Sequence, residues 1–261
     1  MRPVPVLMYH HVSPHKKDMV TITPEVFEKQ MEYLYKSGYK TLTIDELLSC
    51  INGSFIPEQK AVVLTFDDGW IDNHIYALPI IEKYKIHVAI FIITGSTEKA
   101  SENLTQIPSH TPTHKKSKSL IKKGEEQKVL LNWGLIKKMS ATGLIDFYSH
   151  TKNHKKCSLL SDTELLEELQ DSKQAIEKKL GKDCPYLCWP YGDFNNAAVK
   201  IAKDIGYQAL FTINYGIVKA GSDPFAIKRM VVKDDAAWFK KRMVVYTNSI
   251  LSWLYIKIKK R

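Results

Sequence analysis

The chain contains few cysteines and no closely spaced pair of them. Four cysteines occur in 261 residues, and no two of them form a Cys-x-x-Cys motif. This absence excludes the thiol–disulfide exchange motif and the common cysteine-rich zinc sites. We expect four reduced, mostly buried thiols in a protein of a reducing compartment.

Long apolar runs are missing as well. The opening stretch, "MRPVPVLMYHHV", lacks the apolar core of roughly 7–15 residues that marks a secretory signal. No stretch reaches the ~18 consecutive apolar residues of a membrane-spanning helix. We therefore expect a cytoplasmic protein.

Nucleic-acid-binding motifs are absent, although the chain is strongly basic. The net charge is +10, and much of the excess lies in "THKKSKSLIKK" (113–123) and in the final "KIKKR". Neither stretch interleaves aromatic residues with base-reading side chains, so we expect no nucleic-acid partner. The charge instead favours an anionic membrane surface or an anionic substrate.

What is present is a regular alternation of short apolar runs with amphipathic stretches. We expect helices from Pro24 to about Gly38 and over 72–84, 132–142, 161–180 and 195–205. Between them lie the expected strands "VPVLMYH", "AVVLTF" (61–66), "HVAIFIIT" (87–94), "LIDFYS", "PYLCWP" and "YQALFTI". Repeated strand–helix units predict a single α/β domain with a parallel sheet or a barrel.

Residues 95–128 interrupt this alternation. They are rich in Ser, Thr, Lys and Pro and contain few large apolar residues. We expect a long basic loop or insertion, which in a compact domain is often functional.

Two adjacent carboxylates follow an apolar strand in "VVLTFDDGW". Active sites of parallel-sheet enzymes lie at the carboxyl ends of the strands, which is where Asp67 and Asp68 fall. Because successive strand residues point to opposite sides, one carboxylate can bind a metal while the other serves as a base.

A histidine motif with one spacing occurs twice, as "SHTPTH" (109–114) and "SHTKNH" (149–154). His150 directly follows a predicted strand, whereas His110 lies in the basic segment with no strand before it. Rigid elements are needed to hold metal ligands, so the second copy is expected to bind metal. We expect His110 and His114 to be dispensable, with substrate contact or accessory metal binding as the alternative.

Asp68, His150 and His154 would form a set of three protein ligands with open positions. Such a set is typical of a catalytic zinc site, because a structural site is closed by four protein ligands. Zinc is the first expectation, and cobalt, nickel or iron also suit these ligands.

These motifs resemble those of the polysaccharide deacetylases (NodB-homology proteins, carbohydrate esterase family 4). "TFDDG", "SHTKNH" and "LCWPYGDFN" (187–195) are similar to three motifs of that family, over roughly residues 3–235. The opening "VPVLMYHHVS" and the "WPYG" form most resemble the subgroup that deacetylates poly-β-1,6-N-acetylglucosamine.

The resemblance implies a distorted (β/α) barrel of about seven strands, formed by residues 1–240. It implies that Asp67 is the general base, that Asp68, His150 and His154 bind the metal, and that the Tyr191 N–H stabilises the oxyanion. Substrate contact is expected from Trp189 and Pro190 of the third motif and from Arg229 in "IKRMVV", which could instead pair with Asp67.

Two departures from the family pattern concern the base and the acid. Cys188 stands where family members commonly carry an arginine that orients the base, so another residue must do this, and Arg229 is a candidate. No histidine follows His154, so the usual late Leu-x-His acid is missing. In the resembling subgroup an N-terminal histidine supplies the proton, and His10 matches it, with His11 pointing the other way.

The expected function is a metal-dependent N-deacetylase acting on N-acetylhexosamine in a cell-envelope glycan or a lipid-linked saccharide. Alternatives are an O-acetyl esterase, a chitin or peptidoglycan oligosaccharide deacetylase, and an inactive carbohydrate-binding protein.

The last segment, 241–261, is amphipathic and basic. It suits either the surface of an anionic inner membrane or a final helix packed on the barrel.

Overall fold

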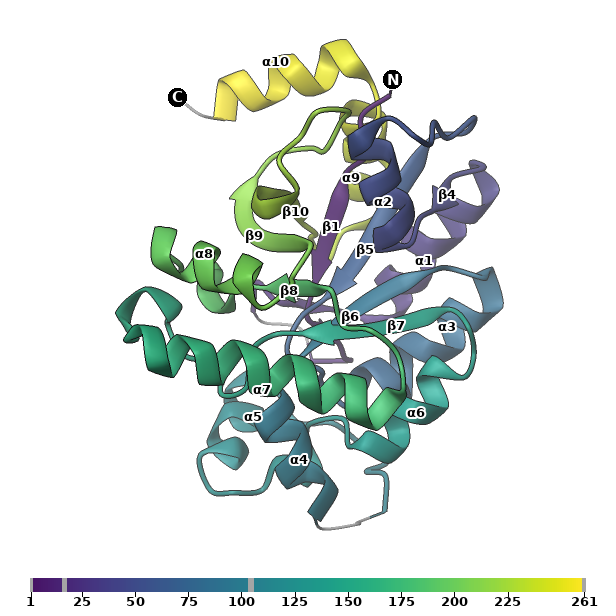
Figure 1. The fold of residues 1–261 in the computed structure, drawn as a ribbon. Coiled ribbons are helices and arrows are strands. Elements are labelled where there is room, and N and C mark those ends of the chain that lie inside the picture. Colours follow the sequence, from purple (N-terminus) through teal and green to yellow (C-terminus); the bar gives the residue numbers. More distant parts are fainter. Residues whose placement is uncertain (1, 16–17, 103–105, 260–261) are drawn as a thin grey trace.

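Seven parallel strands close into a barrel with helices around it (Figure 1). The computed structural model describes residues 2–15, 18–102 and 106–259, with the backbone alone for 258–259. The ring runs β1-β10-β9-β8-β7-β6-β5 and closes through pairing of β5 with β1, while β4 pairs with the first residues of β5. The expected α/β barrel is thereby confirmed. The strands are β1 (Val6–Tyr9), β4 (Lys40–Thr41), β5 (Ala61–Phe66), β6 (Val88–Ile92), β7 (Ile145–Ser149), β8 (Tyr186–Cys188), β9 (Ala209–Tyr215) and β10 (Ile227–Val231), with a separate pair β2 (His11–Val12) and β3 (Thr21–Ile22).

The strands are apolar because both their faces are covered. Every residue of β1, β5 and β6 is buried, between the barrel interior and the surrounding helices. The helices are α1 (Pro24–Lys36), α2 (Ile44–Asn52), α3 (Leu78–Tyr84), α4 (Thr94–Glu102), α5 (His114–Ile121), α6 (Trp133–Ser140), α7 (Asp162–Leu180), α8 (Asn196–Asp204), α9 (Ala236–Tyr246) and α10 (Ser249–Lys259).

Helix boundaries follow the sequence signals closely. The expected capping box at the start of α7 is present, with Ser161 accepting from the Glu164 N–H and Glu164 accepting in return. The stretch over 72–84 differs, because a π-helical turn at Asn73–Ala77 precedes α3. Such turns occur often beside functional sites.

The basic segment 95–128 is more ordered than a loop. Most of α4, all of α5 and a 3₁₀ turn at Glu126–Lys128 lie within it. A small apolar cluster covers Trp70 with Ala100, Val129 and Leu130, with Leu120 packed against it. The segment therefore folds as a helical cap at the carboxyl ends of the strands.

Helix α10 lies at the opposite end of the barrel. It lines a groove of about 800 Å³ together with Pro3, which precedes β1 at the amino end of that strand. The arrowheads of β1 and β5 point away from α10 (Figure 1). Several of its apolar side chains are exposed, Ile250 at 71% and Trp253 at 56%, while Tyr255 packs against the core. None of the described helices is long and apolar enough to cross a bilayer.

Candidate active site

Polar side chains from four strands meet at the carboxyl end of the barrel. Asp67 and Asp68 follow β5, His150 follows β7, His10 follows β1 and Tyr191 lies three residues beyond β8. Parallel strands place their carboxyl ends at one edge, which brings together residues far apart in sequence.

Asp68, His150 and His154 converge on one point. Asp68 Oδ1 lies 3.4 Å from the Nε2 atoms of both histidines. His150 Nδ1 lies 2.8 Å from the Cys188 carbonyl oxygen. Because a carbonyl only accepts, Nδ1 carries the hydrogen and Nε2 keeps its lone pair for a metal. The two imidazole nitrogens and one carboxylate oxygen fit a divalent transition metal such as zinc.

The backbone is strained at this point. Five non-glycine residues of the described chain have positive φ, and four of them belong to the site: Asp68 (74°), Thr151 (64°), His154 (56°) and Tyr191 (58°). Such conformations cost of order 1–3 kcal/mol each and persist only where surrounding contacts enforce them. These backbone conformations therefore reduce the stability of the fold, and they set the directions in which the side chains of the site point.

One anchor for the strained loop is Glu168 of α7, which is buried. Its carboxylate accepts hydrogen bonds at 2.7 Å from both the N–H and the side-chain amide of Asn153. On the other side Gly95 donates to the Lys152 carbonyl at 2.8 Å, and a Cβ at Gly95 would lie 2.7 Å from that oxygen. The loop that carries His154 is thus fixed between α4 and α7.

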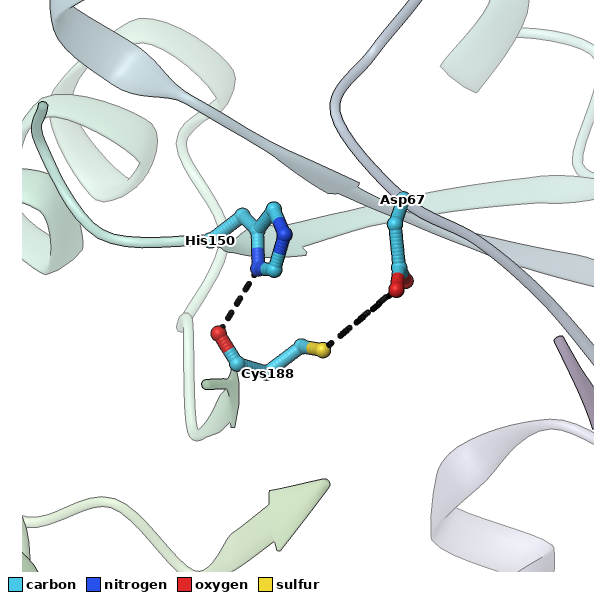
Figure 2. Close-up of side chains that lie close together, drawn as sticks. All are labelled: Asp67, His150 and Cys188. Atoms are coloured by element: carbon cyan, nitrogen blue, oxygen red, sulfur yellow. Dashed lines mark hydrogen bonds between the residues drawn. The ribbon is translucent and has the colours of Figure 1, made fainter. Parts of the chain in front are cut away.

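Asp67 is oriented by a buried arginine. Arg229 of β10 donates to both carboxylate oxygens, at 2.7 and 2.8 Å. The Cys188 thiol also approaches both oxygens, at 3.8 Å, while its carbonyl holds His150 (Figure 2). The Arg229 guanidinium lies 3.0 Å from the Cys188 sulfur. Because this cation already binds Asp67 and Cys188, the grouping of Asp67, His150 and Cys188 does not suit a second metal.

The charges around the two aspartates keep both ionised. Burial by itself would raise the pKa of Asp67, but the Arg229 guanidinium outweighs it and holds that pKa below its ordinary value. Burial likewise opposes ionisation of Asp68, yet the adjacent His150 imidazole and the nearby His10 and His154 imidazoles lower its pKa. An ionised Asp67 can accept a proton, and an ionised Asp68 can bind a cation.

His10 and His11 point in opposite directions. His10 Nε2 lies 3.9 Å from Asp67 Oδ2, and its side chain is 23% exposed to the barrel mouth. His11 is buried, with Nδ1 2.5 Å from Asp72 Oδ2. Burial lowers the pKa of His10, an effect that the charges of Asp67 and Asp68 oppose. His10 alone of the two reaches the site.

Trp189, Pro190 and Arg229, from which substrate contact is expected, all have buried side chains. Trp189 stacks on Phe194 with ring centroids 5.4 Å apart, inside an apolar cluster, and Arg229 holds Asp67. In this structure Trp189 packs in the core next to the site, and Arg229 holds Asp67 in place. Tyr191, 55% exposed with its ring 4.5 Å from that of His154, faces the mouth instead.

The two histidine motifs are used differently. His110 is exposed, whereas His114, the first residue of α5, is half-buried and its Nδ1 lies 2.9 Å from His11 Nε2. Neither joins the group formed by Asp68, His150 and His154. The two histidines of the first motif thus differ, since His114 has a buried partner and His110 is exposed.

Three residues of the site were not predicted for the positions they hold. Glu168 lies three residues after Leu165 on the apolar face of α7, and a carboxylate on such a face was the available signal. Cys188 was marked only by its place at the family's arginine position, and Trp70 carried no signal, because a tryptophan beside a strand is ordinary core.

Comparisons with known proteins agree with this geometry. The family model described as polysaccharide deacetylase matches residues 56–210. The poly-β-1,6-N-acetyl-D-glucosamine N-deacetylase of Staphylococcus aureus (strain N315) is 29% identical over 226 residues, covering 83% of this chain and 69% of that protein. Bacillus subtilis (strain 168) YxkH is 28% identical over 229 residues, covering 88% and 71%.

Solved structures share the fold. The Streptococcus pyogenes deacetylase PplD, in complex with acetate, superposes with a TM-score of 0.77 at 24% identity, covering 92% of this chain and 98% of that one. With the family match extending over more than half of the sequence, the chain belongs to the polysaccharide deacetylase family.

Proposed function

We propose that the protein is a metal-dependent N-deacetylase that removes acetyl groups from N-acetylhexosamine residues of a cell-envelope glycan. The observation that carries this is the convergence of Asp68, His150 and His154 beside the separately oriented base, Asp67. The name of the staphylococcal relative supports an N-acetylglucosamine polymer as the substrate class.

Each residue has a distinct task in the proposed reaction. A metal held by Asp68, His150 and His154 would supply Lewis-acid polarisation and lower the pKa of water. Asp67, kept ionised by Arg229, accepts the proton of the water that attacks the acetyl carbonyl. The Tyr191 N–H donates to the developing oxyanion. His10 returns a proton to the departing amine, so that acetate and a free amino sugar result.

Paired substitutions of the two aspartates test these roles. Asp67→Asn should retain the metal and lose roughly 10²–10⁴-fold in turnover, because the base is gone. Asp68→Asn should weaken metal binding itself, because one of the three ligands is altered. Turnover is measured as acetate released from an N-acetylglucosamine oligomer, with metal content measured by elemental analysis. A metal-free Asp67→Asn beside a metal-loaded Asp68→Asn would reverse the assignment.

Mass spectrometry of envelope glycans from cells with and without the protein identifies the substrate. Loss of free amino sugar without the protein supports N-deacetylation. A change confined to acetyl esters would instead favour an O-acetyl esterase, and unchanged glycans with bound oligosaccharide would favour an inactive binding protein.

We also propose that α10 holds the protein on an anionic membrane surface in the cytoplasm. The exposed Ile250, Leu251, Trp253 and Leu254 offer apolar contact, and Lys219, Lys228 and Lys257 line the same groove. Since α10 lies at the amino end of the barrel, a membrane there would leave the active site facing away from lipid. This arrangement favours a glycan chain over a sugar adjacent to its lipid anchor.

A further inference from the structure

Trp70 contacts the metal-ligand carboxylate directly. Its indole Nε1–H donates to Asp68 Oδ2 at 3.0 Å, while Oδ1 of the same carboxylate faces His150 and His154. The indole therefore fixes the rotation of the carboxylate and leaves the other oxygen for a metal. Hydrogen bonds of this kind orient ligands in metal sites generally.

Trp70 is itself held by an imidazole. Its ring stacks on that of His11 with centroids 4.2 Å apart and an interplanar angle of 27°. The His114 ring meets the indole edge-on at 5.8 Å. Trp70 is 3% exposed, and the helical cap covers it with Ala100, Val129 and Leu130.

A chain of hydrogen bonds fixes His11. Asp72 Oδ2 lies 2.5 Å from His11 Nδ1, and His114 Nδ1 lies 2.9 Å from His11 Nε2. Since a carboxylate only accepts, His11 Nδ1 carries a hydrogen, while His11 Nε2 shares a hydrogen bond with His114 Nδ1 in which either ring can be the donor. Both ring nitrogens of His11 are thus satisfied, and the ring cannot rotate under Trp70 without breaking a buried hydrogen bond.

The helical cap is tied to the barrel at the same place. Ser13 Oγ lies 3.2 Å from Thr111 Oγ1, and the His15 ring contacts the Thr111 carbonyl oxygen at 2.5 Å. The Leu131 N–H donates to the Gly69 carbonyl at 2.9 Å, beside Trp70. His114 is therefore held at a defined position over His11.

These contacts do not form a second metal site. The two ring nitrogens of His11 point to different partners, so Asp72, His11 and His114 lie in a row rather than around one point. No grouping of three potential ligands in the described residues includes His114.

Resting on the proposed metal-dependent function, we infer that the first histidine motif positions the metal ligand Asp68, through His114, His11 and Trp70. The motif at 149–154 supplies ligands, and the motif at 109–114 supplies the support of one ligand. His114 is a positioning residue, since it contacts neither the metal ligands nor the place of reaction.

Metal affinity tests this inference apart from activity. Zinc is removed from the full-length protein, and its dissociation constant is measured by competition with a chromophoric chelator. Trp70→Phe keeps the ring and removes the indole N–H, and His114→Ala removes the support of His11. Both should weaken zinc binding by roughly 10–100-fold. His114→Asn, whose amide can reach the position of Nδ1, should restore most of the affinity, and the exposed His110→Ala should leave it unchanged.

A double-mutant cycle separates positioning from general damage. In the Asp68→Asn background, Trp70→Phe should weaken the residual zinc affinity far less than in the wild type, because its partner is already altered. Equal zinc affinities for wild type, Trp70→Phe and His114→Ala would overturn the inference while leaving the proposed function intact. A wild-type protein that binds no zinc, cobalt, nickel or iron would instead contradict the proposed function.

Discussion

At the scale of single residues, the proposed base, Asp67, is oriented by an arginine from another strand than the family pattern suggests. The family's arginine is replaced by Cys188, and Arg229 reaches Asp67 from β10 on the other side of the barrel. A buried carboxylate paired with a guanidinium in two hydrogen bonds is held in both orientation and charge. The thiol of Cys188 fills the space left beside that pair at 3.8 Å.

Arg229→Met should shift the acidic limb of the pH–rate profile. In the wild type the pKa of Asp67 lies below its ordinary value, so the base is ionised down to low pH. Without the guanidinium only burial remains, which raises the pKa, and activity should fail at a pH about 1–3 units higher as the pH falls. The profile of kcat/KM checks this. An unshifted limb would mean that Arg229 does not set the charge state of Asp67.

Substitution of the two adjacent histidines gives a second comparison. His10→Ala should lower turnover at unchanged metal content, because the proton donor beside Asp67 is lost. His11→Ala should instead lower zinc affinity, through the loss of support for Trp70. Measuring both quantities for both variants distinguishes an acid from a positioning residue, and the reverse pattern would contradict both assignments.

At the scale of elements, α7 is both a structural helix and part of the site. Its apolar residues pack on the barrel, and its buried Glu168 holds the loop of His154. A helix that is capped at Ser161 therefore also holds a strained loop, since its Glu168 binds Asn153, 15 residues earlier in the sequence.

Ser161→Ala should destabilise the protein by about 1 kcal/mol, because the capping box at the start of α7 loses its hydroxyl. Chemical unfolding of the metal-free protein measures the effect. The matched control is Ser161→Thr, for which a smaller loss is expected, since threonine keeps a hydroxyl that can accept the same hydrogen bond. Equal losses in the two variants would show that the hydroxyl is not the stabilising group.

At the scale of the whole molecule, the two ends of the barrel differ in chemistry. The carboxyl end carries the buried charges and the helical cap, and the amino end carries the apolar and basic surface of α10. Ser252 is buried, and Tyr255 lies 5.9 Å from Tyr246, so α10 is attached to the barrel rather than detached from it. Binding through α10 would fix the direction of the active site.

We expect the protein to pellet with anionic phosphatidylglycerol vesicles at low salt, and much less with neutral vesicles or at high salt. Replacing the exposed Trp253 and Leu254 by Ser should abolish pelleting, while Met19→Ser, 90% exposed elsewhere, should not. Activity on a soluble oligosaccharide should persist on vesicles. Equal pelleting of all variants, or loss of activity on vesicles, would contradict the proposed orientation.

The sequence by itself predicted the parallel α/β fold, the proposed metal ligands and the capped helices, and its resemblance to a known family predicted the barrel. Apolar strands ending in "DD" and "SH" place polar residues at one edge of a parallel sheet, and this rule depends only on local order. The caps of α2 and α7 are equally local, because each involves residues three apart.

Only the tertiary structure decided which distant residues support these ligands. Arg229 and Asp67 are 162 residues apart, and His11 and His114 are 103 apart, so no periodicity links them. The tertiary structure also decides which side chains are buried. Trp189 belongs to a sequence motif but lies in the core, whereas apolar residues of α10 such as Ile250 and Trp253 are exposed to solvent. Contacts of this kind depend on how the closed barrel brings its strands and cap together, which short sequence patterns do not encode.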